Sequence, residues 1–274
     1  MCVNDAPALK AADIGIAMGV NGTDVAKQAA RMILADDNFA TIVSAVREGR
    51  AIFANIRKFL RYLLSSNVGE VLTLFLGIIG ASVIGLDVVG GPAVAPLLAA
   101  QILWINLLTD TGPALALGLD PPPGDVMQRP PRKLTDRLID RRMRVDVVFI
   151  AVVMACATLF TLDLKLPAGI VDGSSDLTEA RTAGFTVLVV AQLFNCLNSR
   201  AERTSAFYGL FSNRRLWLAI IGSLALQVAV LYVPMLNRAF ETTPLTGADW
   251  ALCTAMASSV LWMSELKKLV SRAA

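Results

Sequence analysis

Six stretches of the 274-residue chain are apolar over a length that matches a membrane crossing. An α-helix needs about 17 to 25 mainly apolar residues to cross roughly 30 Å of hydrocarbon. The pattern therefore predicts six transmembrane helices, at approximately residues 60–81, 96–118, 145–163, 183–198, 216–236 and 249–266. An even number of crossings places both ends of the chain on the same side of the membrane.

The first 58 residues carry charges throughout and contain no apolar run of membrane length. Their pattern predicts, in order, a strand over 14–19, a helix over 22–30, a strand over 31–35 and a helix N-capped by Asp37 or Asn38. Two strands are too few for a free-standing sheet, so we expect the end of a larger α/β domain. From Phe39 to Leu64 there is no proline, and the last helix is expected to continue unbroken into the first crossing.

Basic residues are distributed unevenly between the predicted loops. The loops 120–144 and 199–215 and the tail after Leu266 hold fourteen Lys and Arg residues, whereas the opposite loops hold three. This bias predicts that both termini are cytoplasmic, and compact loops with Ala- and Arg-rich usage favour a bacterial plasma membrane. A further basic run would coat a cytoplasmic stalk, or equally well anchor the chain to anionic lipid: Arg47, Arg50, Arg57, Lys58 and Arg61.

Composition agrees with a membrane protein and restricts its chemistry. Hydrophobic residues make up 55% and charged residues 17% of the chain, against about 25% charged residues in soluble domains. The absence of histidine excludes imidazole catalysis and histidine metal ligation. Four widely separated cysteines support neither a disulfide framework nor a zinc site. Any site must therefore use carboxylates, amides, hydroxyls and backbone groups.

Two acids, Glu70 and Asp110, lie well inside predicted membrane helices. A charge at the centre of such a helix costs about 2.5 to 3.5 kcal/mol on insertion scales, so it indicates function by default. Asn67 lies three residues before Glu70, and Asn106 lies four before Asp110, next to Thr109. Spacings of three and four place side chains on one helix face. Each helix is thus expected to present a cluster of oxygen donors to the bundle interior.

Gly112 and Pro113 follow Asp110 and predict a break in this helix. Pro113 has no N–H for the carbonyl of Thr109, and a free carbonyl at membrane depth must face protein or a cavity. Oxygen-only donors suit a hard cation, above all Ca²⁺, although Mn²⁺ and Na⁺ stay open. The alternative is that these polar groups only join helices by hydrogen bonds. That reading is favoured for Asn195, Asn198 and Gln227, whereas Gln192 is evenly balanced between the two roles.

Three segments of the soluble part resemble the hinge end of the phosphorylation domain of P-type cation-transporting ATPases, which has an α/β haloacid-dehalogenase-like fold. They are Val3-Asn4-Asp5-Ala6-Pro7-Ala8-Leu9-Lys10, the run 13–19, and Ala35-Asp36-Asp37-Asn38-Phe39. Residues 62–70 and 106–113 resemble the fifth and sixth transmembrane helices of the calcium-pump branch, and Met127-Gln128-Arg129-Pro130-Pro131-Arg132 resembles the following loop. The six predicted crossings would correspond to the family's fifth to tenth.

The resemblance implies a mainly α fold in three parts: the end of the phosphorylation domain (1–45), a cytoplasmic stalk (46–59) and six transmembrane helices (60–274). It implies that the transported ion, expected to be Ca²⁺, is bound by Asn67, Glu70, Asn106, Thr109 and Asp110, with Asp110 shared where two ions are held. Asn4 and Asp5 would belong to a phosphate and Mg²⁺ site, and Lys10 to the adjoining helix. Gln192 replaces a ligand glutamate of sarcoplasmic-type pumps, which puts the ion stoichiometry in doubt.

Other family features are missing from this sequence. Met1-Cys2 stand where the family has the last two residues of Thr-Gly-Asp-Gly, and the phosphorylated Asp-Lys-Thr-Gly segment does not occur. Because phosphoryl transfer needs positioned phosphate, metal and acceptor, the chain alone is expected to be a C-terminal fragment that does not hydrolyse ATP, with ATP and Mg²⁺ bound only by the intact pump.

The expected function is the transport part of an ATP-driven Ca²⁺ pump. The alternatives are a passive cation carrier and a non-transporting regulatory partner of a full-length pump. Expected partners are the lipid bilayer, the transported cation, and the missing N-terminal part or a full-length pump. No nucleic acid is expected.

Overall fold

The structure is a computed structural model that describes residues 3–91, 94–121, 137–202 and 204–273, together with 124, 126–128, 130 and 131. The chain forms two compact units, residues 1–54 with 122–131 and residues 55–121 with 132–274. The pair Met1-Cys2 and three basic residues of the loop 120–144, Arg129, Arg132 and Lys133, lie outside the described residues.

The first unit contains two short parallel strands, β1 (Ile16–Met18) and β2 (Met32–Leu34). The helix α2 (Asp24–Ala29) joins them, and η1 (Val3–Asp5) leads into α1 (Ala6–Ala11). Thr23 caps α2 by accepting a hydrogen bond from the backbone N–H of Ala26 at 3.3 Å. The strand–helix–strand order predicted for residues 14–35 is confirmed, with each element shorter than predicted.

A turn after β2 starts the next helix. Asp37 has a φ of 51°, and its carboxylate accepts hydrogen bonds from the backbone N–H groups of Val20 at 2.9 Å and Asn21 at 2.8 Å. These bonds, first the one from Val20, lower the pKa of Asp37 below its ordinary value. Asn38, and not Asp37, accepts from the N–H of Ala40 at 3.0 Å and so caps the helix.

The helix α3 (Ala40–Ile79) runs for 40 residues without interruption, which confirms the predicted continuity. The expectation that the whole basic run would coat a stalk surface is wrong for three of its members. Arg57, Lys58 and Arg61 are at most 18% exposed at the side chain and form ion pairs. Their partners are acids distant in sequence, at 2.8, 2.5 and 2.9 Å: Asp140, Asp120 and Glu202, respectively.

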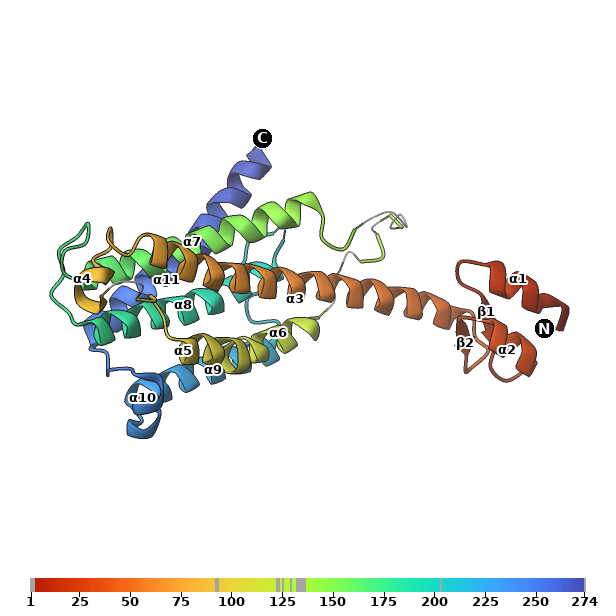
Figure 1. Cartoon of the computed structure of the whole chain (residues 1–274). Helices are drawn as coiled ribbons and strands as arrows, with labels where there is room; N and C mark the ends of the chain where they lie inside the picture. Colours follow the sequence, from red (N-terminus) through yellow and green to blue (C-terminus); the bar gives the residue numbers. More distant parts are fainter. Residues whose placement is uncertain are drawn as a thin grey trace. The chain divides into compact units, whose positions relative to one another are not determined.

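The second unit is helical (Figure 1). After α3 its elements are α4 (Leu86–Gly90), α5 (Ala99–Trp104), η2 (Ile105–Thr109), α6 (Thr111–Gly118), α7 (Arg141–Lys165), α8 (Leu177–Arg200), α9 (Arg214–Tyr232), α10 (Pro234–Phe240) and α11 (Gly247–Ala273). Within this unit α8 packs against α7 and α11, while α9 packs against α6.

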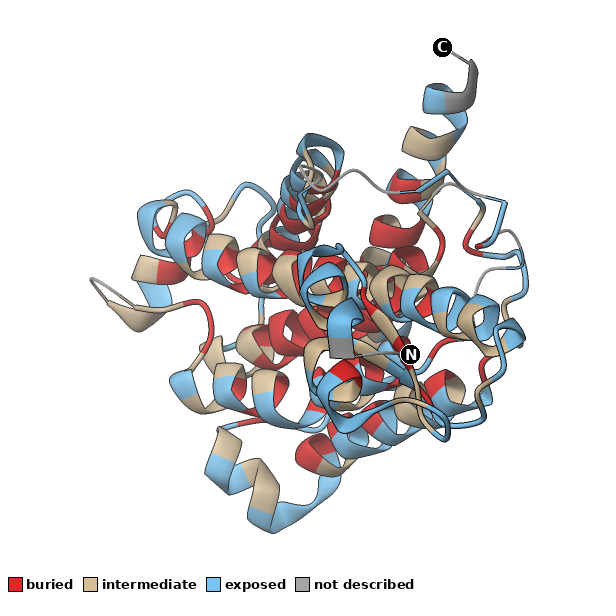
Figure 2. Ribbon diagram, turned by 90° about the vertical axis from the view of Figure 1, so that its right-hand side faces the viewer, coloured by how far each residue is buried: buried red, intermediate tan, exposed pale blue. Residues whose placement is uncertain are grey.

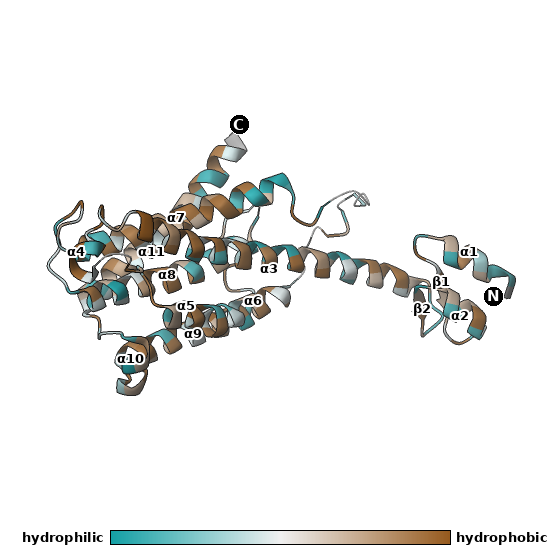
Figure 3. Ribbon diagram, in the orientation of Figure 1, coloured by the Kyte–Doolittle hydropathy of each residue, from teal (hydrophilic) through white to brown (hydrophobic). Residues whose placement is uncertain are grey.

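Four helices within the described residues are long and apolar enough to cross a membrane: α3, α7, α8 and α9. Apolar residues run along each of them (Figure 3). The predicted crossing over 96–118 is divided into α5, η2 and α6, and α11 covers the one predicted over 249–266. The count of six crossings therefore stays a prediction.

Buried residues gather on the faces that the helices of the second unit turn toward one another (Figure 2). The core contains Phe185 and Leu188 of α8, Met154 of α7 and Val260 of α11. Polar side chains also form hydrogen bonds between the buried faces of these helices. Asn195 of α8, for example, donates to Oγ of Ser65 on α3 at 2.7 Å. Two further amides bond neighbouring helices in the same way, which confirms the predicted joining role: Asn198 to the carbonyl of Val260 and Gln227 to Oγ1 of Thr186.

Candidate functional site

Glu70 lies on α3 at a point where three segments of the second unit meet. Its side chain is buried, with 3% of the residue exposed. Oε2 accepts a hydrogen bond from Nδ2 of Asn106 in η2 at 2.6 Å. Oε1 accepts one from Nε2 of Gln192 in α8 at 2.7 Å. The structure therefore brings three residues singled out in the sequence into direct contact.

Asp110, at the junction of η2 and α6, is 1% exposed. Its Oδ1 accepts a hydrogen bond from the hydroxyl of Tyr62 on α3 at 2.7 Å. Its Oδ2 is buried and has no hydrogen-bond partner among the described residues. A buried carboxylate oxygen without a partner loses its hydration and gains nothing in return, so it is a position where a ligand would be stabilising.

The two acids share an electrostatic property. The hydrogen bonds that they accept within the described part of the chain come from two amides and a phenol, all of them neutral. By contrast, the buried Asp120 of the same unit pairs with two cations, Lys58 and Arg200. Carboxylates inside a membrane normally face a partner charge or a cavity. A bound cation would supply the charge that the described side chains do not.

The polypeptide before Asp110 departs from an ordinary α-helix. In η2 the hydrogen bonds span five residues, and the N–H of Asp110 bonds the carbonyl of Ile105 at 3.0 Å. The predicted break at Gly112 and Pro113 is wrong in position, because both residues lie inside α6. Pro113 is the third residue of α6, where a backbone N–H has no partner within the helix, so a proline is tolerated there.

Thr109 is the residue whose carbonyl Pro113 leaves without a helical donor. That carbonyl accepts a hydrogen bond from Oγ of Ser223 on α9 at 3.0 Å. The hydroxyl of Thr109 donates to the carbonyl of Ile105 at 3.0 Å. The carbonyl oxygen of Thr109 therefore lies at a contact with α9, and its hydroxyl oxygen is bonded within its own segment, both next to Asp110 in the chain.

Asn67 is placed differently from the other candidates. It is exposed, and its Nδ2 donates to the carbonyl of Leu63 in its own helix at 2.8 Å. The structure thus groups Glu70, Asn106 and Gln192 and leaves Asn67 outside this group. The ligand roles of all these residues stay predictions.

Two residues near the acids were not selected from the sequence, Tyr62 and Ser223. Tyr62 is fully buried and could have been noticed as an aromatic hydroxyl in an apolar helix, where it needs a hydrogen-bond partner. Ser223 gave no signal beyond being a small polar residue in an apolar run.

The phosphate and Mg²⁺ candidates belong to the first unit. Asn4 and Asp5 are exposed in η1, and Lys10 is exposed on α1. Their roles stay predictions, since Met1, which stands in the position of the family's Mg²⁺-binding aspartate, lies outside the described residues.

The donors around Glu70 and Asp110 fit a hard cation. Each amide at present donates through nitrogen, and a half-turn of its terminal torsion would present its oxygen instead. Carboxylate, amide and backbone oxygens are the ligands that Ca²⁺ prefers, six to eight at a time. Within the described residues there is no cluster of three or more cysteine or acidic side chains that would suit another kind of metal centre.

Residues 94–270 match the model of the family described as cation transporting ATPase, C-terminus. The chain belongs to this family. The resemblance to P-type cation-transporting ATPases of the calcium-pump branch is thereby confirmed, and the chain is an integral membrane protein of that type.

Similar proteins cover almost the whole chain. It is 42% identical over 256 residues, or 93% of its length, to a calcium-transporting ATPase of Bacillus subtilis. It is 42% identical over 268 residues to the mouse calcium-transporting ATPase type 2C member 2 and 38% identical over 271 residues to the human type 2C member 1. The chain spans 27% of the length of the first two and 28% of the third.

Proposed function

We propose that the chain is the ion-transporting part of an ATP-driven pump, and that it binds Ca²⁺ between α3 and the η2–α6 segment. The observation that carries this proposal is the pair of buried carboxylates, Glu70 and Asp110, whose hydrogen-bond donors are neutral. The similar proteins are calcium-transporting ATPases, which supports Ca²⁺ as the ion.

In the proposed site, the two carboxylates supply two negative charges, which balance one divalent ion. Asn106 and Gln192 turn their amide oxygens toward the ion when it displaces their hydrogen bonds to Glu70. Thr109 contributes an oxygen beside Asp110. Asn67 becomes a ligand only if α3 rotates about its axis near this residue and brings the exposed side chain to the ion. Because Gln192 is neutral where a glutamate would add a third charge, we infer that one Ca²⁺ ion is bound at a time.

We infer that six segments cross the membrane, with α5, η2 and α6 together as one crossing and α11 as another. Both termini then lie in the cytoplasm of a bacterium, on the side of the basic loops. Residues 1–45 would be the end of a phosphorylation domain and 46–59 a stalk. In the intact pump, ATP and Mg²⁺ would act through that domain.

Equilibrium binding of radioactive calcium to the purified chain in lipid nanodiscs tests this proposal. Glu70→Gln and Asp110→Asn each remove one charge from the site while keeping the shape of the side chain. Each is expected to weaken Ca²⁺ binding by about tenfold or more, because a hydrogen bond or contact to a charged group contributes roughly 1.5–3 kcal/mol.

Glu265→Gln is the matched control. Glu265 lies on α11, where its carboxylate accepts from the N–H of Ala206 at 2.9 Å and pairs with Lys268. Its variant removes the same charge from the same bundle and should leave Ca²⁺ affinity unchanged. Unaltered affinity in both Glu70→Gln and Asp110→Asn would refute the site. Calcium flux through the chain in vesicles without ATP would instead favour a passive carrier.

A further inference from the structure

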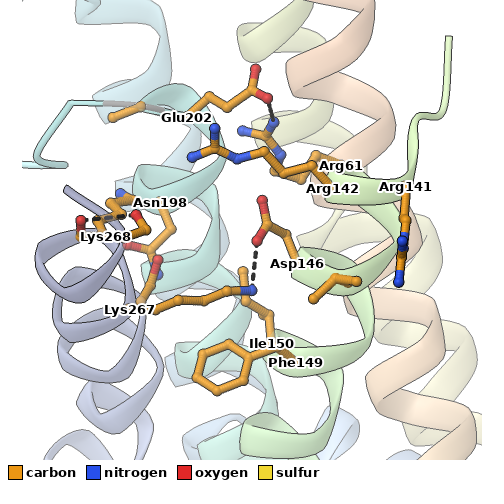
Figure 4. Close-up of a pocket in the computed structure, with 14 residues that line it drawn as sticks. Arg61, Arg141, Arg142, Asp146, Phe149, Ile150, Asn198, Glu202, Lys267 and Lys268 are labelled. Carbon is orange, nitrogen blue, oxygen red and sulfur yellow. Dashed lines mark hydrogen bonds and ion pairs between the residues drawn. The ribbon is translucent and has the colours of Figure 1, made fainter. Parts of the chain in front are cut away.

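A cavity of about 550 Å³ lies among four elements of the second unit (Figure 4), and neither Glu70 nor Asp110 is part of its lining. Its walls come from Arg61 of α3, the first ten residues of α7, the end of α8 with the two residues after it, and residues 264–271 of α11. Since α7 begins here and α8 and α11 end here, the cavity lies at one end of the membrane bundle, where hydrocarbon meets water.

The lining is strongly basic. It contains five cationic residues and only two acids, and each acid is already paired: Asp146 with Lys267 at 2.6 Å, and Glu202 with Arg61 at 2.9 Å. The guanidinium groups of Arg141 and Arg142 form no ion pair with any described residue and are exposed. The cavity therefore keeps positive charge that an anion would neutralise.

Arg61 provides a second, independent observation. Arg61 is 3% exposed, and its Nε is buried. This nitrogen nevertheless has no hydrogen-bond partner among the described residues. Oδ1 of Asn198, which lines the same cavity from α8, is also buried without a described partner. An unsatisfied donor and an unsatisfied acceptor in the lining of one cavity suit a ligand that carries both an anionic oxygen and a hydroxyl group.

The cavity continues onto an apolar surface. A neighbouring cavity of about 500 Å³ shares Arg141, Val145 and Phe149 with the first and adds Arg144 and Val148. Val145 and Val148 are 53% and 54% exposed on α7, a helix apolar enough to face lipid. A basic pocket that opens onto such a face fits an amphipathic ligand better than a small soluble ion.

We propose that this cavity binds the head group of an anionic phospholipid of the phosphatidylglycerol class, with one acyl chain along the Val145–Phe149 face of α7. The phosphate lies between Arg61, Arg142 and Lys267, and the glycerol hydroxyls lie near Asn198. This inference does not depend on which ion the protein transports.

Native mass spectrometry of the purified full chain, titrated with phosphatidylglycerol or phosphatidylcholine, tests the proposal. Arg142→Gln is the main variant, because Arg142 is exposed and its loss should leave the fold intact. Phosphatidylglycerol binding is expected to weaken about fivefold, the effect of one basic residue near a phosphate. Lys267→Gln, checked for folding by its melting curve, is expected to do the same.

Arg214→Gln is the matched control, since Arg214 is an exposed basic residue at the start of α9 and outside the cavity. Its phosphatidylglycerol affinity should equal that of the parent chain. An equal loss in Arg214→Gln, or equal binding of phosphatidylcholine, would overturn the proposal in favour of diffuse charge. Displacement of the lipid by millimolar glycerol phosphate would overturn the lipid assignment and identify a soluble-phosphate site.

Discussion

Replacing Asp120 by asparagine should destabilise the helical bundle more than any other single removal of charge at the end of the bundle that carries the basic loops. The Asp120 side chain is 3% exposed and lies 2.5 Å from Nζ of Lys58 and 3.0 Å from Nε of Arg200. Asn213 also donates to its Oδ1 at 2.9 Å. Asparagine keeps the size and one acceptor oxygen, but it removes the charge and replaces the other oxygen with an NH2 donor that faces the donors of Lys58 or Arg200.

The magnitude follows from the burial of the partners. Their side chains are 12% and 14% exposed, so both cations would stay largely buried without their acid. Breaking a buried pair on one side costs roughly 3–5 kcal/mol, and we expect about 3 kcal/mol here because the cations keep some contact with water. The free energy of unfolding can be measured by tryptophan fluorescence during denaturation in mixed micelles.

Asp140→Asn is the control for this prediction. The Asp140 side chain is 43% exposed in its 2.8 Å pair with Arg57, so the loss should stay below about 1 kcal/mol. Asp140 also caps α7 by accepting from the N–H of Met143 at 2.7 Å, a bond that asparagine can retain. Equal losses in the two variants would refute the argument that burial decides the strength of these pairs.

Two further predictions concern neighbouring groups. Tyr62→Phe removes the hydroxyl that donates to Asp110, so the unfolding free energy without Ca²⁺ should fall by about 1–3 kcal/mol. Added Ca²⁺ should restore most of it in a melting experiment. Burial alone would raise the pKa of Glu202, but Arg61 and Arg57 outweigh it and lower the pKa below its ordinary 4.5. The stabilising effect of ionised Glu202 is thus present above pH 4.5 and lost as the pH falls further. In Glu202→Gln, the melting temperature should therefore decrease less steeply than in the parent chain when the pH is lowered below 4.5.

The sequence was informative wherever a property depended on neighbours along the chain. Apolar runs located the long helices, and the absence of proline between Phe39 and Leu64 predicted the unbroken α3. Spacing along one helix also selected Glu70, Asn106 and Asp110 as polar groups of the interior, and all but Asn106 are buried.

Pairings between distant residues could not be read in the same way. The acidic partners of Arg57, Lys58 and Arg61 lie between 62 and 145 residues away along the chain, and no local pattern connects them. Gly112 and Pro113 suggested a break at their own position, yet a proline in the first turn fits an intact helix. The irregular turn lies instead at Ile105–Thr109, where hydrogen bonds join the segment to Ser223 of α9 and Glu70 of α3, partners that no local pattern indicates.

The neutral surroundings of Glu70 and Asp110 also have a consequence for the energetics of a working pump. In the proposed pump, one Ca²⁺ ion would bring the charge of the pair to zero, so the loaded site would reorient across the membrane potential with little electrical work. The empty, ionised pair carries two negative charges, each worth about 2.3 kcal/mol per 100 mV over the full field. In the proposed pump, the return of the empty site would therefore be the voltage-sensitive half of the cycle.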